Sequence, residues 1–340
     1  MIDNLEINEY KGLIDFKLQD LSQINIISGK NNVGKTMLLE AISISKNITN
    51  LRLFKTNMEF IYLRRELNYD NVYEKLKKIS LNIKSSENNV IIKAKSDYEL
   101  GEDEAQFLKK QYYDPTTKEF LTMHHNDDLI DIISLTKENE VSIVTFQTFF
   151  INSSPSNNYY LTQLYKTIQD LDMQSKFLKY LQIIDKNISG IEPYPTHIVA
   201  QDGKSIQSFA LRVTLKNPKH SLLSSELGEG TNRFIEILCT LLSNKNGTVL
   251  IDEIENGIHY TKLYDIWKAI IEIVQKEKIQ LFVTTHDLES IEALNRASED
   301  MHFEKISSIT LERDEDNIIY PIVRKYSSFT ATVDSGMDIR

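Results

Sequence analysis

The sequence predicts an α/β protein, and three observations support that class. An apolar run, Ile24–Ser28, has the pattern of a buried strand that leads through a glycine-containing turn into a leucine-rich helical stretch. Beyond about residue 196, short apolar strand patterns alternate with longer helical patterns, which is typical of α/β folds. Of the 340 residues, 41% are hydrophobic and 26% are charged, the composition of a globular chain with a full core.

The N-terminal half contains several regions that differ in pattern. In the first 30 residues apolar and polar positions alternate, which predicts a hairpin before the buried strand. Residues 36–78 have a helical pattern, residues 79–125 contain short alternating segments that predict a small antiparallel β region, and residues 127–190 are mostly helical in pattern. A polar stretch at 152–158 is expected to be a loop.

The C-terminal part is expected to continue the α/β alternation and to end in two strands joined by a turn at 314–317. The preceding elements are predicted as a strand at 209–215, a helix at 230–244, a strand at 248–252, a helix at 260–277, a strand at 279–284 and a helix at 287–297.

Charge and cysteine content exclude several classes of function. With 39 Lys+Arg against 49 Asp+Glu the formal net charge is -10, so contact with DNA requires a local basic patch. The candidate residues for such a patch are Arg52, Lys55, Arg64, Arg65, Lys75, Lys77 and Lys78. A solvated helix face is the simpler explanation of these basic residues. The single cysteine, Cys239, excludes disulfide frameworks, cysteine-rich zinc sites and CxxC redox chemistry.

The sequence also gives expectations about localisation. No segment approaches the roughly 18 consecutive apolar residues that span a bilayer. Acidic residues, Asp3 and Glu6, stand where a secretory signal has basic ones. We therefore expect a cytoplasmic protein without membrane contact.

The turn after the first buried strand matches a phosphate-binding motif. Residues 29–36 read GKNNVGKT, which fits G-x-x-x-x-G-K-[ST] between a strand and a helix. In such a loop backbone N–H groups surround the β-phosphate, Lys35 supplies positive charge to the β- and γ-phosphate oxygens, and the Thr36 hydroxyl ligates Mg²⁺. The candidate nucleotide-binding residues here are Gly29, Asn31, Asn32, Gly34, Lys35 and Thr36.

A second motif supplies the carboxylates that a phosphate-binding loop needs. The apolar pattern at 248–251 ends in Asp252 and Glu253. We expect Asp252 to hold the Mg²⁺ shell and Glu253 to polarise the attacking water as catalytic base. Apolar runs that end in Asp-Glu are common, so this motif indicates a nucleotide site only in combination with the phosphate-binding loop.

Two further segments complete the predicted site. A buried strand pattern at 281–285 ends at His286, whose imidazole is expected to reach the γ-phosphate; a polar cap of the strand is the structural alternative. Upstream, two glycines before a helix predict an anion-facing turn, with a loop capped by Thr231 as the alternative. The candidate nucleotide-binding residues of this turn are Gly228, Glu229, Gly230 and Arg233.

The order of these motifs resembles that of the ABC-type ATPases, the group of RecF, the SMC proteins and the OLD family. Segments 27–36, 227–233 and 252–259 are most similar to the OLD-type bacterial ATPases, which recur in anti-phage systems such as Gabija and PARIS. The tail, residues 336–340, is also similar to their short ATPase-only members.

The resemblance implies an α/β P-loop NTPase of the ABC, RecF and SMC-head type. It covers roughly 1–60 and 205–340, so we expect these segments to form the ATPase core and 60–204 to form a β arm plus a mainly helical insertion. Such a protein binds ATP with Mg²⁺ and hydrolyses it. The signature loop of one subunit closes over nucleotide held by another, which implies a homodimer or higher homo-oligomer whose interface ATP stabilises.

For function, the resemblance implies a sensor or scaffold subunit in anti-phage defence. The effector, a TOPRIM nuclease or a toxin, is then encoded separately, and a phage protein is the expected trigger. The runner-up interpretation is a RecF-like, ATP-dependent, DNA-binding repair factor.

Two features depart from the ABC pattern. The usual signature is Leu-Ser-Gly-Gly-Gln, whereas residues 227–231 read LGEGT and lack the serine that contacts the γ-phosphate. Arg233 or Asn232 is the expected substitute for that contact. The best candidate for the glutamine of the Q-loop is Gln147, after a strand pattern at 141–146.

Other interpretations have weaker support. The acidic segment 314–316 resembles a TOPRIM metal motif, but the chain after it is too short for that domain, and a solvated turn is expected. The polar residues 124–128 suggest a metal cluster but are explained by a surface loop. SMC-type bridging lacks support because residues 36–251 contain no sustained heptads. The poor signature and the N-terminal hairpin disfavour a transporter ATPase.

Overall fold

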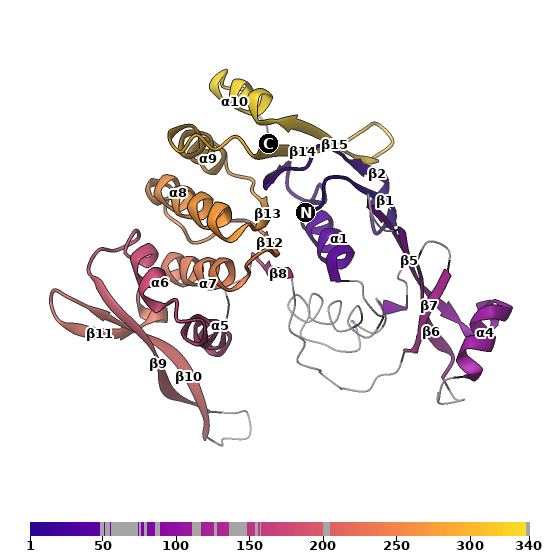
Figure 1. The fold of residues 1–340 in the computed structure, drawn as a ribbon, viewed down its shortest axis with the longest axis horizontal. Coiled ribbons are helices and arrows are strands. Elements are labelled where there is room, and N and C mark those ends of the chain that lie inside the picture. Colours follow the sequence, from indigo (N-terminus) through magenta and orange to yellow (C-terminus); the bar gives the residue numbers. More distant parts are fainter. Residues whose placement is uncertain are drawn as a thin grey trace. The chain divides into compact units, whose positions relative to one another are not determined.

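A computed structural model describes residues 1–47, 51, 55, 74, 76–77, 80–85, 89–110, 117–125, 128–135, 148–153, 156, 158–199 and 205–337. The chain divides into two compact units, drawn as a ribbon in Figure 1. The first unit comprises Met1–Leu21, Gly29–Thr148 and Ile309–Val323, and the second comprises Ser22–Ser28, Phe149–Ser308 and Arg324–Arg340.

The first unit is built on an antiparallel sheet with the strand order β2-β1-β4-β5-β6-β7. Its strands are β1 (Leu5–Tyr10), β2 (Leu13–Leu18), β4 (Ser80–Ser85), β5 (Asn89–Ser96), β6 (Glu119–His125) and β7 (Asp128–Ser134). The predicted N-terminal hairpin is confirmed, because β1 pairs with β2 in the register Leu5 to Leu18. Alternate residues of this hairpin, such as Leu5 and Ile7, are fully buried, as the period of two requires.

The helices of the first unit whose bounds the structure describes are α1 (Lys35–Asn47), the 3₁₀ helix η1 (Asp97–Glu99) and α4 (Glu102–Lys109). Helix α1 begins within the phosphate-binding motif and is tied to β1, because Tyr10 Oη and Lys11 Nζ both donate to Glu40 Oε2 (3.2 and 2.6 Å). Helix α4 lies in the region for which only strands were predicted. Its Leu108 packs with Phe120 and Ile132 of the sheet, so tertiary packing favours a helix there.

The second unit contains the sheet that leads into the phosphate-binding motif. Four of its six strands lie in the order β3 (Ile24–Ser28), β13 (Gln280–Thr284), β12 (Thr248–Ile251) and β8 (Thr148–Ile151). The pairs β3/β13 and β13/β12 are parallel, and every residue of these three strands is buried, as expected for parallel strands. Their carboxyl ends therefore lie at one edge of the sheet.

Three helices, α7 (Glu229–Ser243), α8 (Tyr260–Glu277) and α9 (Leu288–Asp300), lie side by side along this sheet (Figure 1). Their apolar faces form the main core, in which Trp267 is the largest fully buried side chain. Trp267 Nε1 donates to Ser290 O (3.0 Å) and so joins α8 to α9. The three helices predicted from the sequence in this region are therefore confirmed. Helix α9 ends three residues beyond its predicted end.

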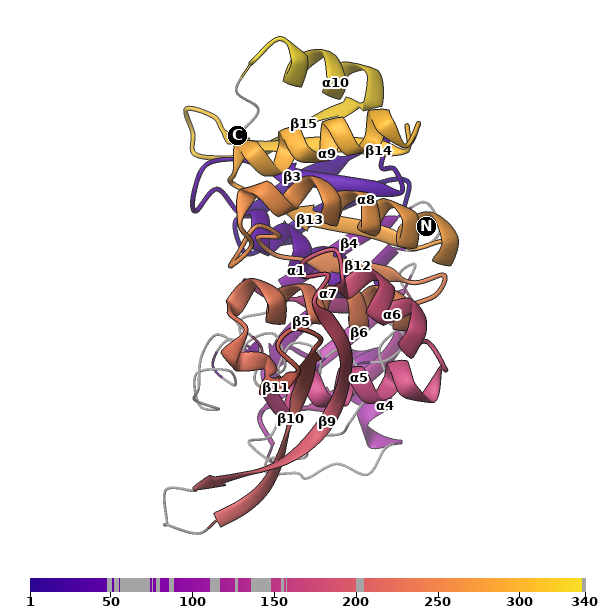
Figure 2. The same cartoon turned by 90° about the vertical axis from the view of Figure 1, so that its left-hand side faces the viewer.

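The rest of the second unit precedes α7. Helices α5 (Asn158–Asp170) and α6 (Gln174–Leu181) pack together, with Tyr165 edge-on against Phe177 at a ring-centroid distance of 5.2 Å. The long hairpin β9 (Ile188–Val199) and β10 (Ser205–Leu215) projects from these helices, as Figure 2 shows. Strand β11 (His220–Leu223) pairs with β10, and the 3₁₀ helix η2 (Ser224–Glu226) leads to α7.

The C-terminal elements are β14 (Ile306–Arg313), β15 (Ile319–Lys325) and α10 (Tyr326–Asp334). Strand β14 starts beside β3 in the second unit, where Ile24 N donates to Lys305 O (3.0 Å), and continues in the first unit beside β15. The turn between β14 and β15 is exposed, and Asp314 Oδ1 accepts a hydrogen bond from Ile318 N (2.8 Å). The expectation of a solvated hairpin turn at 314–316 is thus confirmed.

Several sequence predictions need correction or lie outside the described residues. The mostly helical pattern at 127–190 is wrong for β7, β8 and the start of β9, because pairing with neighbouring strands overrides an ambiguous apolar spacing. The boundaries at 60 and 205 stay a prediction, since both units contain parts of 60–204. Residues outside the described ranges include Arg52, Arg64, Arg65, Lys75, Lys78, Gln147 and the strand pattern at 141–146.

Membrane-spanning helices and clusters of metal ligands are both absent from the described residues. None of the helices there is both long and apolar enough to cross a bilayer. Nor do three or more His, Cys, Asp or Glu side chains gather around a possible cation position in that part of the chain. Of residues 124–128, for which a surface loop was expected, His124 and His125 lie on β6 and Asp128 lies on β7, because these two strands pair with each other.

Candidate nucleotide-binding site

The phosphate-binding loop follows β3 without interruption and requires its glycines. Gly29 has a φ of +140° and Gly34 one of +120°, values that side chains rarely allow. A Cβ added to Gly29 would lie 2.7 Å from Leu311 O, so that close approach also excludes a larger residue. Asn32 has a φ of +63°, a conformation that asparagine tolerates better than most residues.

Lys35 stays close to the loop that it follows. Its side chain is largely buried, and Nζ donates to Gly29 O (2.7 Å) and Lys30 O (3.1 Å). These bonds hold the ammonium against the loop. Lys35 and the half-buried Thr36 are the first two residues of α1. Asn31 and Asn32 are exposed, and Arg313 Nη2 donates to Asn32 O (3.4 Å). The contribution of Arg313 was not predicted, because nothing in the sequence marks this contact.

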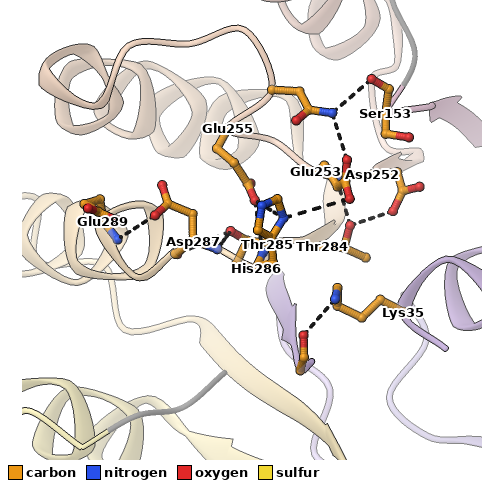
Figure 3. A network of polar contacts seen from close by, with 12 residues as sticks. Lys35, Ser153, Asp252, Glu253, Glu255, Thr284, Thr285, His286, Asp287 and Glu289 are labelled. Atoms are coloured by element: carbon orange, nitrogen blue, oxygen red, sulfur yellow. Dashed lines mark hydrogen bonds and ion pairs between the residues drawn. The ribbon is translucent and has the colours of Figure 1, made fainter. Parts of the chain in front are cut away.

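Asp252 lies directly after β12 in the second unit and is 4% exposed. Thr284 Oγ1, at the end of the neighbouring strand β13, donates to Asp252 Oδ1 (2.7 Å), as Figure 3 shows. The same Thr284 oxygen accepts a hydrogen bond from Glu253 N (2.8 Å). One threonine thus organises both carboxylate positions of the predicted motif.

Glu253 has an unusual backbone conformation. Its φ is +51°, the left-handed region that residues other than glycine seldom occupy. Asn256 Nδ2 donates to Glu253 Oε2 (2.8 Å), and His286 Nδ1 lies 3.9 Å from Oε1 (Figure 3). The carboxylate is about one-third exposed, so it can meet solvent water while its direction is fixed.

His286 follows β13 as predicted, and its partners are acidic. Glu255 Oε1 accepts hydrogen bonds from His286 N and lies 3.0 Å from His286 Nδ1. The next residue, Asp287, caps α9 by accepting from Glu289 N (3.3 Å). Burial, a side-chain hydrogen bond with Glu289 and the negative charge of Glu289 raise the pKa of Asp287 to about 6, against the lowering effect of the bond from Glu289 N.

The signature turn forms the N-terminus of α7. Gly228 is the N-cap with a φ of +101°, and the helix begins at Glu229, one residue before the predicted start. A Cβ on Gly230 would lie 2.2 Å from Gly257 O, so Gly230 allows α7 to pack against the turn that follows Glu253. A groove of about 340 Å³ runs along this contact and is lined by Gly228, Glu229, Gly230 and Ile258, among others.

Arg233, for which a nucleotide contact was expected, lies in the interior of the second unit. It is 5% exposed, and its guanidinium donates to the backbone carbonyls of Asn152, Asp252 and Glu253 within the second unit. Burial lowers the pKa of Arg233, while Glu236 and Asp252 raise it. Arg233 is the fifth residue of α7, at the start of the buried stretch that continues to Leu242, and this explains its interior position.

The predicted site residues thus fall into two groups. Gly29, Asn31, Asn32, Gly34, Lys35 and Thr36 belong to the first unit, and Gly228, Glu229, Gly230, Arg233, Asp252, Glu253 and His286 belong to the second. Within the second unit the structure brings Asp252, Glu253 and His286 together at the edge where β12 and β13 end.

Asp252 suits a magnesium ion. Mg²⁺ is typically bound by one or two protein carboxylates together with substrate phosphates, and it keeps several of its waters. A single buried carboxylate at the strand ends of the second unit, held in direction by Thr284, fits that mode of binding.

Sequence reasoning missed the residues that support the carboxylates. Thr284 and Asn256 contact Asp252 or Glu253 directly, and Asn256 Nδ2 also donates to Ser153 O (3.0 Å), just after β8. Asp252 N donates to Ile151 O (2.8 Å), so the end of β8 adjoins the end of β12. The apolar run 149–151 followed by polar residues was the available signal for this third strand end.

The fold and the motifs together define a P-loop ATPase whose fold is similar to that of SMC heads. An SMC head solved with the C-terminal winged-helix domain of ScpA matches with a TM-score of 0.51 and 12% identity, over 95% of this chain and 97% of that chain. At that identity the similarity shows the fold alone.

The chain belongs to the family described as "AAA domain, putative AbiEii toxin, Type IV TA system", whose model matches residues 24–292. It is 20% identical over 367 residues to an "ATP/GTP phosphatase" of Helicobacter pylori, covering 94% of this chain and 95% of that protein. A shorter match, 46% over 44 residues, links it to the uncharacterized protein MJECL10 of Methanocaldococcus jannaschii, covering 13% of this chain and 20% of that protein.

Proposed function

We propose that this P-loop ATPase hydrolyses ATP with Mg²⁺ at an interface between copies of the chain, and that it thereby controls a separately encoded effector in anti-phage defence. The observation that supports ATP hydrolysis is the arrangement of the two carboxylates in the turn after β12. There a 4% exposed Asp252 and a partly exposed Glu253 share one organising side chain, Thr284. A buried carboxylate and a water-accessible one are what metal binding and water activation require.

In the proposed reaction the first step is binding of the triphosphate by the loop after β3. Backbone N–H groups of the loop and the N-terminus of α1 bind the phosphates. Lys35 exchanges its carbonyl partners, Gly29 and Lys30, for β- and γ-phosphate oxygens. The exposed Asn31 and Asn32 are the remaining proposed nucleotide contacts of the loop.

Asp252 and Thr36 are the residues that would hold Mg²⁺. When bound, the ion neutralises charge on the β- and γ-phosphate oxygens. Thr284 fixes the orientation of the Asp252 carboxylate through its hydrogen bond to Oδ1.

Glu253 is the proposed catalytic base. Its carboxylate accepts a proton from the water that attacks the γ-phosphorus, while the bond to the bridging oxygen breaks and ADP leaves. His286, held by Glu255, is placed to contact the γ-phosphate beside this base. The name of the Helicobacter pylori relative, an ATP/GTP phosphatase, supports hydrolysis as the outcome.

The proposed interface is built by the signature turn. Gly228, Glu229 and Gly230 stand at a helix N-terminus beside an open groove. We expect a second copy to present its nucleotide to this turn, so that ATP stabilises the closed oligomer. Mass measurement in solution should show at least a dimer for Glu253→Gln with ATP, and a strict monomer with and without ATP would contradict this part.

The proposed defence role has two supports. One is the resemblance of the motifs to OLD-type defence ATPases, and the other is the family description, which names a toxin of a type IV toxin–antitoxin system. A separately encoded toxin or TOPRIM nuclease is accordingly the proposed effector, with a phage protein as the trigger.

Phage plating tests the defence role. Cells that carry the gene with its native neighbours should resist infection, and Lys35→Ala should abolish that resistance without unfolding the protein. Lys305→Ala, at a distance in sequence from every motif, is the matched control and should protect like the wild type. Failure to protect against a broad phage panel, together with DNA-damage sensitivity on deletion, would instead favour the RecF-like repair factor.

A further inference from the structure

Arg233 occupies a position that the proposed chemistry has not yet used. It lies on the second turn of α7 and is 5% exposed. Nη1 donates to Asn152 O, after β8, and Nη2 donates to Asp252 O (2.6 Å) and Glu253 O (3.3 Å), after β12. One planar cation therefore binds the carbonyls at the ends of two adjacent strands.

The residue that these bonds secure is under conformational strain. A non-glycine residue in the left-handed region costs on the order of 1 kcal/mol, so Glu253 keeps its φ of +51° only if its surroundings enforce it. Thr284 holds the amide of Glu253 and Arg233 holds its carbonyl, while Asn256 N also donates to that carbonyl (3.1 Å). The peptide on each side of Glu253 is thus fixed.

The same network fixes the carboxylate. Asn256 Nδ2 bridges Glu253 Oε2 and Ser153 O, so the direction of the carboxylate depends on the segment after β8. Arg233 binds the residue before Ser153, and Glu236, one turn along α7, accepts a hydrogen bond from Ser156 in that segment. Helix α7 therefore contacts both segments that set where Glu253 points.

We propose that Arg233 is a positioning residue for Glu253: by binding the carbonyls of Asn152, Asp252 and Glu253 together, it holds the turn in which the Glu253 carboxylate faces the attacking water. This inference rests on the proposed ATPase function. Lysine cannot replace the arginine fully, because a single ammonium lacks the flat array of donors that reaches carbonyls on two segments. Through α7, the signature turn and the base belong to one rigid assembly.

The structure offers a direct way to test this role. A pocket of about 190 Å³ beside Arg233 is lined by Asn232, Glu236 and Asn256, among others. Arg233→Ala would extend this pocket by the volume of the lost side chain. Free guanidinium, at concentrations that do not denature, should then enter and replace the missing group.

The measurement is steady-state ATP hydrolysis by the full chain. Arg233→Ala should lower kcat about 100-fold and leave KM within about threefold, because misplacing a base costs on this order while nucleotide binding is untouched. Guanidinium should restore at least a tenth of the lost rate, and ethylammonium should not. Arg212→Ala, which removes an arginine that pairs with Glu192 on the β9–β10 hairpin, is the matched control and should keep kcat within twofold.

A second variant covers the case in which Arg233→Ala does not fold. Arg233→Lys should remain folded by circular dichroism and lose kcat roughly tenfold at constant KM. Wild-type kcat in both folded variants, or a rise in KM without loss of kcat, would overturn the positioning role. So would a folded Arg233→Ala that guanidinium fails to reactivate. A wild-type chain that does not hydrolyse ATP would refute the proposed function instead, so the two failures are distinguishable.

Discussion

Thr284 Oγ1 donates a 2.7 Å hydrogen bond to Asp252 Oδ1 while it accepts one from the next residue's amide, Glu253 N. The threonine is fully buried, so both bonds form away from water. A single side chain from the neighbouring strand therefore fixes the proposed metal ligand and the backbone of the proposed base.

Thr284→Val should destabilise the protein and lower ATP turnover. Valine has the same shape, but it leaves Asp252 Oδ1 without this donor and Glu253 N without its acceptor, which costs about 1–3 kcal/mol per buried group. Thermal unfolding measures the stability change, and ATP hydrolysis with varied Mg²⁺ measures the effect on the site.

Thr240→Val is the matched control for that substitution. Thr240 is equally buried, on α7, and its hydroxyl has no hydrogen-bond partner in the described part of the chain. Valine should therefore leave the stability unchanged or raise it slightly. Equal losses in the two variants would show that the Thr284 hydroxyl has no special role.

Gly230→Ala should destabilise the second unit through a backbone clash. The added Cβ would approach Gly257 O to 2.2 Å, a distance that requires α7 or the turn after Glu253 to shift. Overpacking of this kind costs about 1–3 kcal/mol, which chemical denaturation can resolve. Gly190→Ala is the control, because its Cβ meets nothing closer than 3.9 Å, and it should be nearly neutral.

Asp287→Asn should stabilise the protein at neutral pH but not at pH 4. Burial and the neighbouring Glu289 raise the pKa of Asp287 to about 6, so the folded state binds this proton more tightly than the unfolded state. That contribution to stability is complete below about pH 4 and is lost as the pH rises through 6. Asparagine keeps the N-cap and cannot ionise, so the gain at pH 7 should be on the order of 1 kcal/mol after allowance for solvent screening.

Thermal denaturation at pH 4 and pH 7 checks this prediction. Glu289→Gln should shift stability in the same direction by less, because it removes only one of the causes. An Asp287→Asn variant with the same gain at both pH values would point to a cause other than ionisation.

The sequence predicted the elements whose signals are local. β3, β12 and β13 are continuous apolar runs that end in polar motifs, and α8 matches its predicted bounds because its period is regular over eighteen residues. β7 was mistaken for a helix because the spacing of Leu129, Ile130, Ile132 and Ile133 suits both structures. Only its pairing with β6, which the sequence does not contain locally, decides between them.

The site residues also divide into those with a local sequence signal and those whose roles depend on distant contacts. Lys35, Asp252, Glu253 and His286 could be proposed from the sequence because each stands in a motif at a strand end. Arg233 was assigned to the nucleotide because its motif neighbours are glycines, whereas in the structure it binds Glu236 Oε2 and carbonyls 19 to 81 positions away. Thr284 and Asn256 were missed for the same reason: their roles depend on which strands lie side by side.

The account's central claim is that Glu253 activates water for ATP hydrolysis. The most direct measurement compares ATP turnover and ATP binding of the wild type with those of Glu253→Gln. Glutamine keeps the size and the contact with Asn256 but cannot accept the proton, so turnover should fall at least about 100-fold while the Kd for ATP stays within a few-fold. Turnover by Glu253→Gln at the wild-type rate would contradict the account.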